Sequence, residues 1–291
     1  MTLCIAGIAF RDNRIITVSD YMLSNTTDSI EVLGTAKVTP LSGGKWVSVF
    51  AGHPGVAAKI NKAVHASFDG KPPTAAQIRA AYQREFQAAL KHKIEDLLLG
   101  RFGLTMADFL KKGHAAFGDG EFSALVREMS RTTLDTEFVV AGFEPNGAPA
   151  LFSVGDPFGN DPATVIDQSH LRFCAIGTGA QLANASLFSA FPFADSLGEV
   201  IYRLAEAKYR GERAPGVGPS TLICTLDSDG NWKIMMPGDD MTLKMHWEQH
   251  GRISPMLPRI DETVDRLLLK FITKNAPDSQ SPSGTDSEAK Q

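Results

Sequence analysis

Residues 2–20 of this 291-residue chain read TLCIAGIAFRDNRIITVSD, which is two apolar segments separated by a short polar turn. β-Branched residues recur in both segments, and Asp12-Asn13 stands at the turn, where a positive φ costs little. The pattern predicts a β-hairpin whose second strand ends at the carboxylate of Asp20. The first strand begins at Thr2, directly after Met1. The expected hairpin therefore starts at a hydroxyl group and ends at a carboxylate.

Strand and helix patterns follow the hairpin in blocks. Short apolar runs bounded by turn residues predict strands over residues 35–40, 45–52, 137–143, 150–154, 171–176, 221–226 and 232–236. Apolar residues at helical spacing, with Thr74/Gln77 and Ser196/Glu199 as capping boxes, predict helices over residues 56–68, 74–100, 105–110, 122–129, 181–189, 196–207 and 260–273. Residues 237–258 are expected to be irregular, and the tail 275–291, which lacks large apolar residues, to be disordered.

This order of strands, helices, strands, helices and strands indicates the fold class. Helices that come in blocks argue against a doubly wound parallel sheet, in which a helix follows nearly every strand. Two antiparallel sheets with a helical layer outside each satisfy the order, which makes the chain an α+β protein. We expect one domain over residues 2–274, expanded by the helical residues 100–131.

The bulk composition excludes several classes of protein. The net charge is −4 and the pI about 6.0, so a nucleic-acid partner is not indicated. Cys4, Cys174 and Cys224 lie far apart and do not form a disulfide or zinc pattern, which is typical of a cytoplasmic protein. We find no signal-peptide pattern and no apolar run long enough to span a membrane.

The beginning of the chain offers the chemistry of an N-terminal nucleophile. Removal of Met1 would give Thr2 a free α-amino group beside its own hydroxyl, which places a general base and a nucleophile on one residue. Lys37, on the next predicted strand, offers a cation, and Asp20 could hold that lysine by a charge-assisted hydrogen bond. Gly52, at the end of the strand 45–52, could supply the backbone N–H that stabilises an oxyanion.

These residues, in this order, resemble the proteasome-type threonine peptidases, which include proteasome β-subunits, the bacterial HslV peptidase and Anbu. The resemblance covers about residues 2–235. It implies an αββα sandwich, hydrolysis of peptide bonds through an acyl-enzyme, and self-assembly into rings or spirals. Carried over by position, it implies that Thr2 is nucleophile and base, that Asp20 and Lys37 complete the constellation and that Gly52 gives the oxyanion N–H. Thr178 falls where the family has a serine that bonds the threonine amine.

The chain departs from the family pattern in two places. Its first hairpin is two residues longer, so that a count without gaps back from Asp20 puts Cys4 on the nucleophile position. We favour Thr2, because only processing at Met1 makes a free amine plausible. The family usually has an Asp and a Ser in the region that here reads GVGPS (residues 216–220), and no aspartate precedes these glycines.

Other motifs do not indicate a cofactor or a metal. The Gly43-Gly44-Lys45 sequence lacks the spacing of a phosphate-binding loop, and the Gly177–Gly179 turn lacks the third glycine of a dinucleotide fingerprint. His246 and His250 are four residues apart, but no third ligand is evident, so we expect two solvated histidines. Two alternatives to a peptidase stay open, namely a non-catalytic proteasome-like subunit and an amidase of small amides. The sequence does not identify an ATPase partner.

Overall fold

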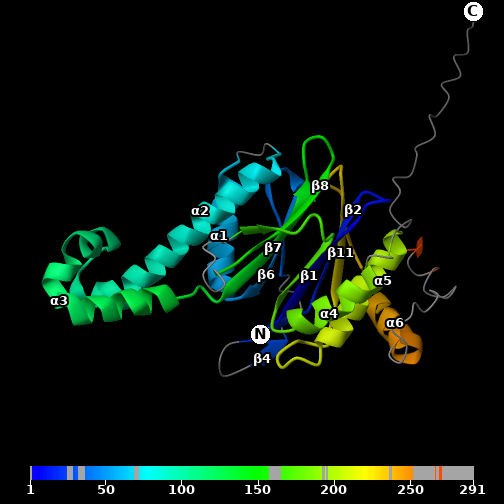
Figure 1. The fold of residues 1–291 in the computed structure, drawn as a ribbon. Helices are drawn as coiled ribbons and strands as arrows, with labels where there is room; N and C mark the ends of the chain where they lie inside the picture. Colours follow the sequence, from blue (N-terminus) through cyan, green and yellow to red (C-terminus); the bar gives the residue numbers. More distant parts are fainter. Residues whose placement is uncertain are drawn as a thin grey trace, which may run out of the picture.

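The computed structural model describes residues 2–24, 29–31, 37–68, 72–156, 165–191, 194, 196–235, 238–251, 266 and 269–270. Two five-stranded antiparallel sheets face each other, and helices cover the outer face of each sheet (Figure 1). The molecule is thus the four-layer αββα sandwich expected from the order of elements. The predicted tail at 275–291 and most of the predicted helix at 260–273 lie outside the described residues.

The first sheet is built around the hairpin that the N-terminal sequence predicts. Its strands are, in spatial order, β10 (Phe173–Gly177), β1 (Leu3–Ala9), β2 (Arg14–Ser19), β11 (Leu222–Asp227) and β12 (Trp232–Ile234). Asn13 at the hairpin turn has a φ of 45°, as a tight turn at Asp-Asn requires. The start of β1 and the end of β2 therefore lie side by side, at one end of the sandwich.

The second sheet carries the next predicted strands. Its spatial order is β5 (Val38–Pro40), β6 (Trp46–Gly52), β7 (Thr136–Phe143), β8 (Pro149–Val154) and β9 (Val165–Asp167). A separate two-stranded ribbon joins β3 (Met22–Ser24) and β4 (Ser29–Glu31). The helices α1 (Pro54–Ala66) and α2 (Ala75–Ile94) cover the outer face of the second sheet, and α4 (Ala180–Ala190) and α5 (Leu197–Gly211) cover that of the first.

Three hydrophobic clusters correspond to the three contacts between the four layers. One joins the first sheet to α4 and α5, one joins the second sheet to α1 and α2, and one lies between the sheets. The predicted capping boxes at Thr74/Gln77 and Ser196/Glu199 are confirmed at the starts of α2 and α5. Local helix signals and the burial of apolar faces therefore agree in this part of the chain.

The predicted helical expansion forms an arm that projects from the sandwich (Figure 1). The arm comprises a π-helical turn (Glu95–Leu99), a 3₁₀ turn (Gly100–Phe102) and α3 (Met106–Arg131). The two helical segments predicted here belong to one element, which is kinked where Gly118 has a φ of 70°. The arm has its own small core around Leu99, Phe109 and Leu125.

The prediction of an irregular segment at residues 237–258 is wrong for its first part. Residues Asp239–His246 form α6, followed by a π-helical turn, Trp247–Gly251. Leu243 and Trp247 pack into the core beside α5, and this tertiary burial stabilises a helix whose own periodicity is weak. His246 is buried against Tyr202 rather than solvated, while the side chain of His250 lies outside the described residues. No helix in the described part of the chain is long and apolar enough to cross a bilayer.

Candidate functional site

The antiparallel register of β1 brings the predicted site residues to one end of the sandwich. Cys4 pairs with Ser19 and Leu3 pairs with Gly177, so Thr2 lies between the end of β2 and the turn after β10. The backbone N–H of Asp20 donates to the carbonyl of Leu3 at 3.2 Å. The hairpin that the sequence predicts is thus the element that sets Asp20 beside Thr2.

Lys37 completes a buried cluster with these two residues. Its Nζ donates hydrogen bonds both to Thr2 Oγ1 and to Asp20 Oδ1, and the Thr2 hydroxyl donates to the same carboxylate oxygen. The three residues are each at most 3% exposed. Because two opposite charges are buried together, each offsets only part of the cost of burying the other, and their interaction with the hydroxyl is weakly screened by water.

The second carboxylate oxygen of Asp20 is held by backbone groups. Asp20 Oδ2 accepts from the N–H of Leu3 at 3.3 Å and from the N–H of Gly218 at 3.1 Å. Gly218 belongs to the glycine-rich segment at 216–220, where the family aspartate is missing. Sequence reasoning did not find this contact, because a backbone N–H leaves no residue-specific signal in the sequence.

The turn after β10 holds the main chain of Thr2. Thr178 Oγ1 donates to the carbonyl oxygen of Thr2 at 3.3 Å and the N–H of Gly179 reaches it at 3.5 Å. The contact of Thr178 is therefore with the Thr2 carbonyl, whereas the resemblance implies a contact with the amine. Gly177 has a φ of 90°, and a Cβ there would come within 2.3 Å of the Thr2 oxygen, so only glycine allows this close approach.

Gly52 ends β6 near the same cluster. The N–H of Phe50 donates to the carbonyl of Lys37 at 3.3 Å, which ties this end of β6 to the lysine. Gly52 has a φ of 103°, and an added Cβ would lie 2.0 Å from the carbonyl oxygen of Asp135. The backbone conformation thus requires glycine here. That its N–H receives an oxyanion stays a prediction.

Cys4 is the alternative nucleophile that the count without gaps suggests. The residue is completely buried, and its Sγ donates to the carbonyl of Phe50 at 3.1 Å. Burial raises the pKa of the Cys4 thiol to about 12, despite the nearby ammonium of Lys37. The thiol is therefore protonated at neutral pH. Lys37 and Asp20 form hydrogen bonds with the hydroxyl of Thr2, which favours Thr2 over Cys4 as the nucleophile.

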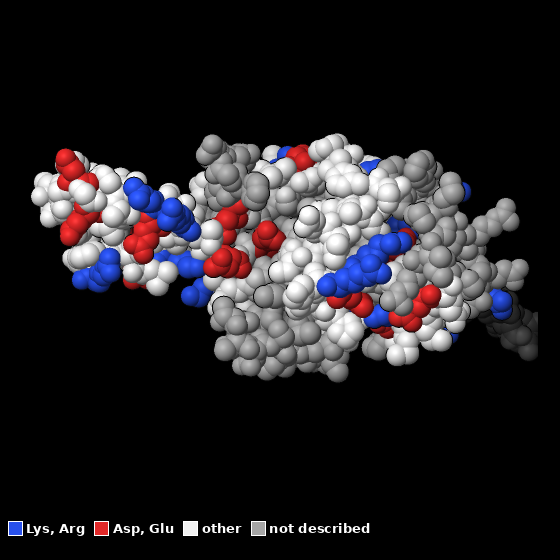
Figure 2. All heavy atoms as spheres, turned by 60° about the horizontal axis from the view of Figure 1, so that its bottom comes forward, with Lys and Arg blue, Asp and Glu red and all other residues white. Residues whose placement is uncertain are grey.

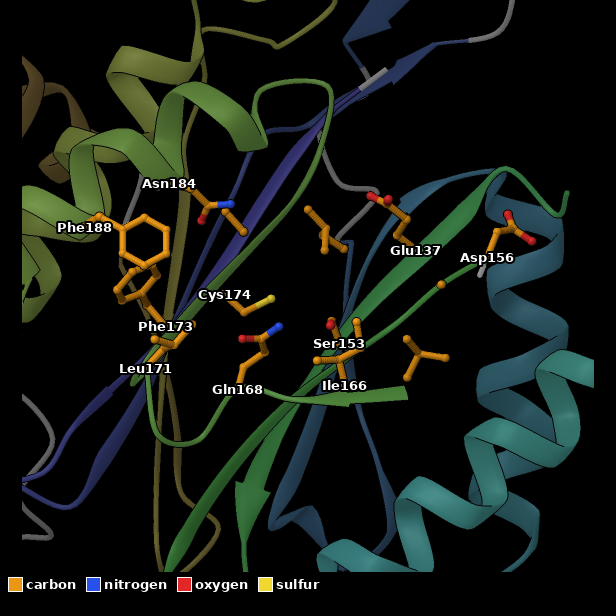
Figure 3. Close-up of a pocket in the computed structure, with 14 residues that line it drawn as sticks. Glu137, Ser153, Asp156, Ile166, Gln168, Leu171, Phe173, Cys174, Asn184 and Phe188 are labelled. Carbon is orange, nitrogen blue, oxygen red and sulfur yellow. The ribbon is translucent and has the colours of Figure 1, made fainter. Parts of the chain in front are cut away.

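A cavity of about 500 Å³ opens between the edges of the two sheets (Figure 3). Glu137 of β7 and Ser153 of β8 line it on one side, and Phe173 and Cys174 of β10 line it on another, with Phe188 of α4 at its rim. Thr2, Asp20 and Lys37 are not among its lining residues. Glu137 connects the cavity to the site, because its carboxylate accepts from the N–H of Gly177 at 2.8 Å.

The surface charge is mixed on the face shown in Figure 2. Acidic and basic side chains lie close together along the projecting arm (Figure 2). Neither sign of charge therefore dominates the described part of this face.

Comparison with known proteins supports the fold. No protein-family model matches the chain, and no curated protein matches it by sequence. Among solved structures, the chain is similar to a Gly-1 mutant of Anbu from Hyphomicrobium sp. strain MC1, with a TM-score of 0.57 and 13% sequence identity. The match covers 86% of this chain and 94% of that one. The chain therefore has the same fold as Anbu, which is one of the proteins that its N-terminal residues resemble.

Proposed function

We propose that this protein is an N-terminal-threonine hydrolase that cleaves peptide bonds through an acyl-enzyme on Thr2. The observation that carries the proposal is the convergence of Lys37 Nζ and the Asp20 carboxylate on Thr2 Oγ1 in a buried site. A core threonine that only fills space needs neither a cation nor a carboxylate, and burying both is costly. The likeness to Anbu supports the proposal at the level of the fold.

The proposed reaction begins with removal of Met1, which frees the α-amino group of Thr2. This amine takes the proton from Oγ1 as the oxygen attacks the substrate carbonyl. The ammonium of Lys37 stabilises the negative charge that develops on Oγ1, and Asp20 keeps the ammonium in place. The amine then protonates the leaving amino group, and an ester remains on Oγ1. Water hydrolyses this ester and regenerates Thr2.

Gly52 and Thr178 have supporting roles in this proposal. The N–H of Gly52 faces the tetrahedral oxyanion, a contact of the kind that is worth about 10²–10³ in rate. Thr178 holds the carbonyl of Thr2 and so orients the new N-terminus. We further propose that the protein acts in the cytoplasm as a ring or spiral of identical subunits, as the family resemblance implies. The reaction requires no cofactor.

A mass measurement on the intact protein tests this function. A peptide epoxyketone forms a ring only with a hydroxyl and a free amine on the same residue. We expect loss of Met1 and addition of one inhibitor per chain, located on Thr2. A Thr2→Ala variant is the control and should remain unmodified. Retention of Met1 on most molecules, or equal labelling of the variant, would contradict the proposal.

A non-catalytic subunit of the same fold is the second candidate. It is favoured by the segment at 216–220, which lacks the aspartate that the resembling family has there. In this chain the segment contacts Asp20 through the backbone N–H of Gly218 instead. In that case hydrolysis of model peptide amides should be the same for the wild type and Thr2→Ala. An amidase of small amides would label at Thr2 but prefer small amides over peptides in substrate profiling.

A further inference from the structure

Lys208, near the end of α5, is a buried cation outside the cluster around Thr2. Its side chain is fully buried, and three hydrogen bonds use all the protons of the ammonium group. Nζ donates to Glu212 Oε1 at 2.6 Å, to the carbonyl of Gly218 at 2.9 Å and to the carbonyl of Pro219 at 3.0 Å. Two of the three bonds therefore go to the backbone of one short loop.

This loop, residues 215–219, forms one wall of the candidate site. The N–H of Gly218 donates to Asp20 Oδ2, and Thr178 Oγ1 reaches the carbonyl of Pro215 at 3.4 Å while it also contacts Thr2. Val217 packs into the core beneath the loop. A shift of the loop would thus change the surroundings of Asp20 directly.

We infer that Lys208 is a positioning residue, which fixes the 215–219 loop so that the N–H of Gly218 stays on Asp20. The loop carries no aspartate of its own that could anchor it to the site. Instead, a buried ammonium group donates to two successive carbonyls and holds the loop through its backbone. The inference rests on the proposed function for its catalytic consequence, whereas the loop contact itself is a property of the resting protein.

The cost of burying the charge of Lys208 is an argument for a role in holding the loop. Burial lowers the pKa of Lys208, although Glu212 acts in the opposite direction, so keeping the charged form buried has a cost in stability. The same helix also buries Arg203 and Glu206, which are paired with each other, whereas Lys208 directs two of its three hydrogen bonds to the 215–219 loop. The contact with the loop therefore distinguishes Lys208 from the other buried charges of α5.

Lys244 on α6 provides a matched control. It donates to the other oxygen of the same partner, Glu212 Oε2, at 2.7 Å, and its Nζ lies 5.7 Å from the centre of the Tyr209 ring, against 6.0 Å for Lys208. Its hydrogen bond goes to Glu212 and not to the loop. Substituting each lysine by methionine therefore separates the loop contact from the shared contact with Glu212.

The test uses the full chain and two measurements. Hydrogen–deuterium exchange, followed by mass spectrometry, reports the peptide that covers residues 213–221. Labelling by a peptide epoxyketone gives two constants: kinact reports the reactivity of Thr2, and KI reports binding of the inhibitor. We expect Lys208→Met to speed exchange in this peptide and to lower kinact by about tenfold or more, with KI changed less than about twofold, as for loss of one hydrogen bond to a charged group. Lys208→Arg should recover part of the loss, and Lys244→Met should behave as the wild type.

Several results would overturn the inference. Unchanged exchange in Lys208→Met would show that the lysine does not hold the loop. An equal fall of kinact in Lys244→Met would assign the effect to Glu212. An increase in KI with kinact unchanged would assign it to inhibitor binding. If Lys208→Met does not fold, Lys208→Gln replaces it, with the same expected direction. If the wild type is not labelled, the proposed function fails, and the exchange measurement still decides whether Lys208 holds the loop.

Discussion

The β1–β2 hairpin carries an ion pair at each of its ends, and the two pairs have different surroundings. At the end that holds Thr2, Lys37 and Asp20 have side chains that are 2% and 0% exposed. At the turn end, Arg14 and Asp227 are joined at 2.8 Å with side chains 26% and 13% exposed. The same hairpin thus takes part in one pair that is sealed from water and in one that is partly exposed.

In the proposed mechanism it is the burial of the pair beside Thr2, rather than the mere presence of a pair, that activates the hydroxyl. The pair at the turn end is partly exposed, and Asp227 also accepts hydrogen bonds from Asp229 and Asn231, so its carboxylate keeps partners when Arg14 is lost. The pair beside Thr2 is not screened, and its field acts on the hydroxyl between the two groups. Each prediction below concerns a residue of the hairpin or one that lies near one of its ends.

The largest effect is expected from Lys37→Met. The change leaves the Asp20 carboxylate buried without its cation, which should cost about 3–5 kcal/mol in the free energy of unfolding. It also removes the charge that stabilises Oγ1, so labelling by a peptide epoxyketone should slow by about 10²–10³-fold or more. Arg14→Met is the matched control at the turn end, and it should cost less than about 1 kcal/mol and leave labelling unchanged. Similar losses in both variants would contradict the comparison.

Gly52→Ala is expected to have the next largest effect on stability. The new Cβ would lie 2.0 Å from the carbonyl of Asp135 at a φ of 103°, so the backbone must shift, at a cost of about 3 kcal/mol. Gly147, whose carbonyl accepts from Asn13 near the hairpin turn, has a φ of 83° and open space around its Cβ. Gly147→Ala should therefore cost only about 1 kcal/mol. Urea unfolding of both variants measures the difference, and equal costs would contradict the clash at Gly52.

Cys4 tests which residue of β1 is the nucleophile. The Cys4→Ser variant keeps a donor for the carbonyl of Phe50, and we expect its labelling rate to stay within about threefold of the wild type. A pKa of about 12 also leaves a thiolate fraction about 10³-fold below that of an ordinary thiol at pH 8. Iodoacetamide should therefore modify Cys4 only after unfolding. Rapid alkylation of Cys4 in the folded protein, or loss of labelling in Cys4→Ser, would favour Cys4 instead.

The smallest effect concerns acid stability at the turn end. Burial alone raises the pKa of Asp227, but hydrogen bonds from Asn231 and the charge of Arg14 outweigh it, so the pKa lies below its ordinary value. A lowered carboxyl pKa stabilises the folded state fully above the unfolded pKa of about 3.9, and this stabilisation is lost as the pH falls through the folded value. The wild type should thus lose stability relative to Asp227→Asn below about pH 4. A constant difference between pH 7 and pH 3 in thermal unfolding would contradict this assignment.

Much of the sandwich could be predicted because its signals are local. The hairpin at residues 2–20, the capping boxes at Thr74 and Ser196 and the blockwise order of elements depend on residues close in the sequence. The helix α6 was missed because its stability comes from packing Leu243 and Trp247 beside α5, which no local pattern reports. The prediction that His246 is solvated is wrong for the same reason.

In the candidate site, too, some features follow from local sequence and others from tertiary packing. The sequence by itself determined that Thr2 and Asp20 stand at the open end of one hairpin and that a lysine follows at Lys37, because hairpin pairing follows from short-range patterns. Only the tertiary structure decided that Lys37 donates to Thr2 rather than to Cys4, that Gly218 donates to Asp20, and that Lys208 donates to the carbonyl of Gly218. Register between sheets and contacts of backbone groups arise when distant segments pack together, and their geometry has no counterpart in any single stretch of the sequence.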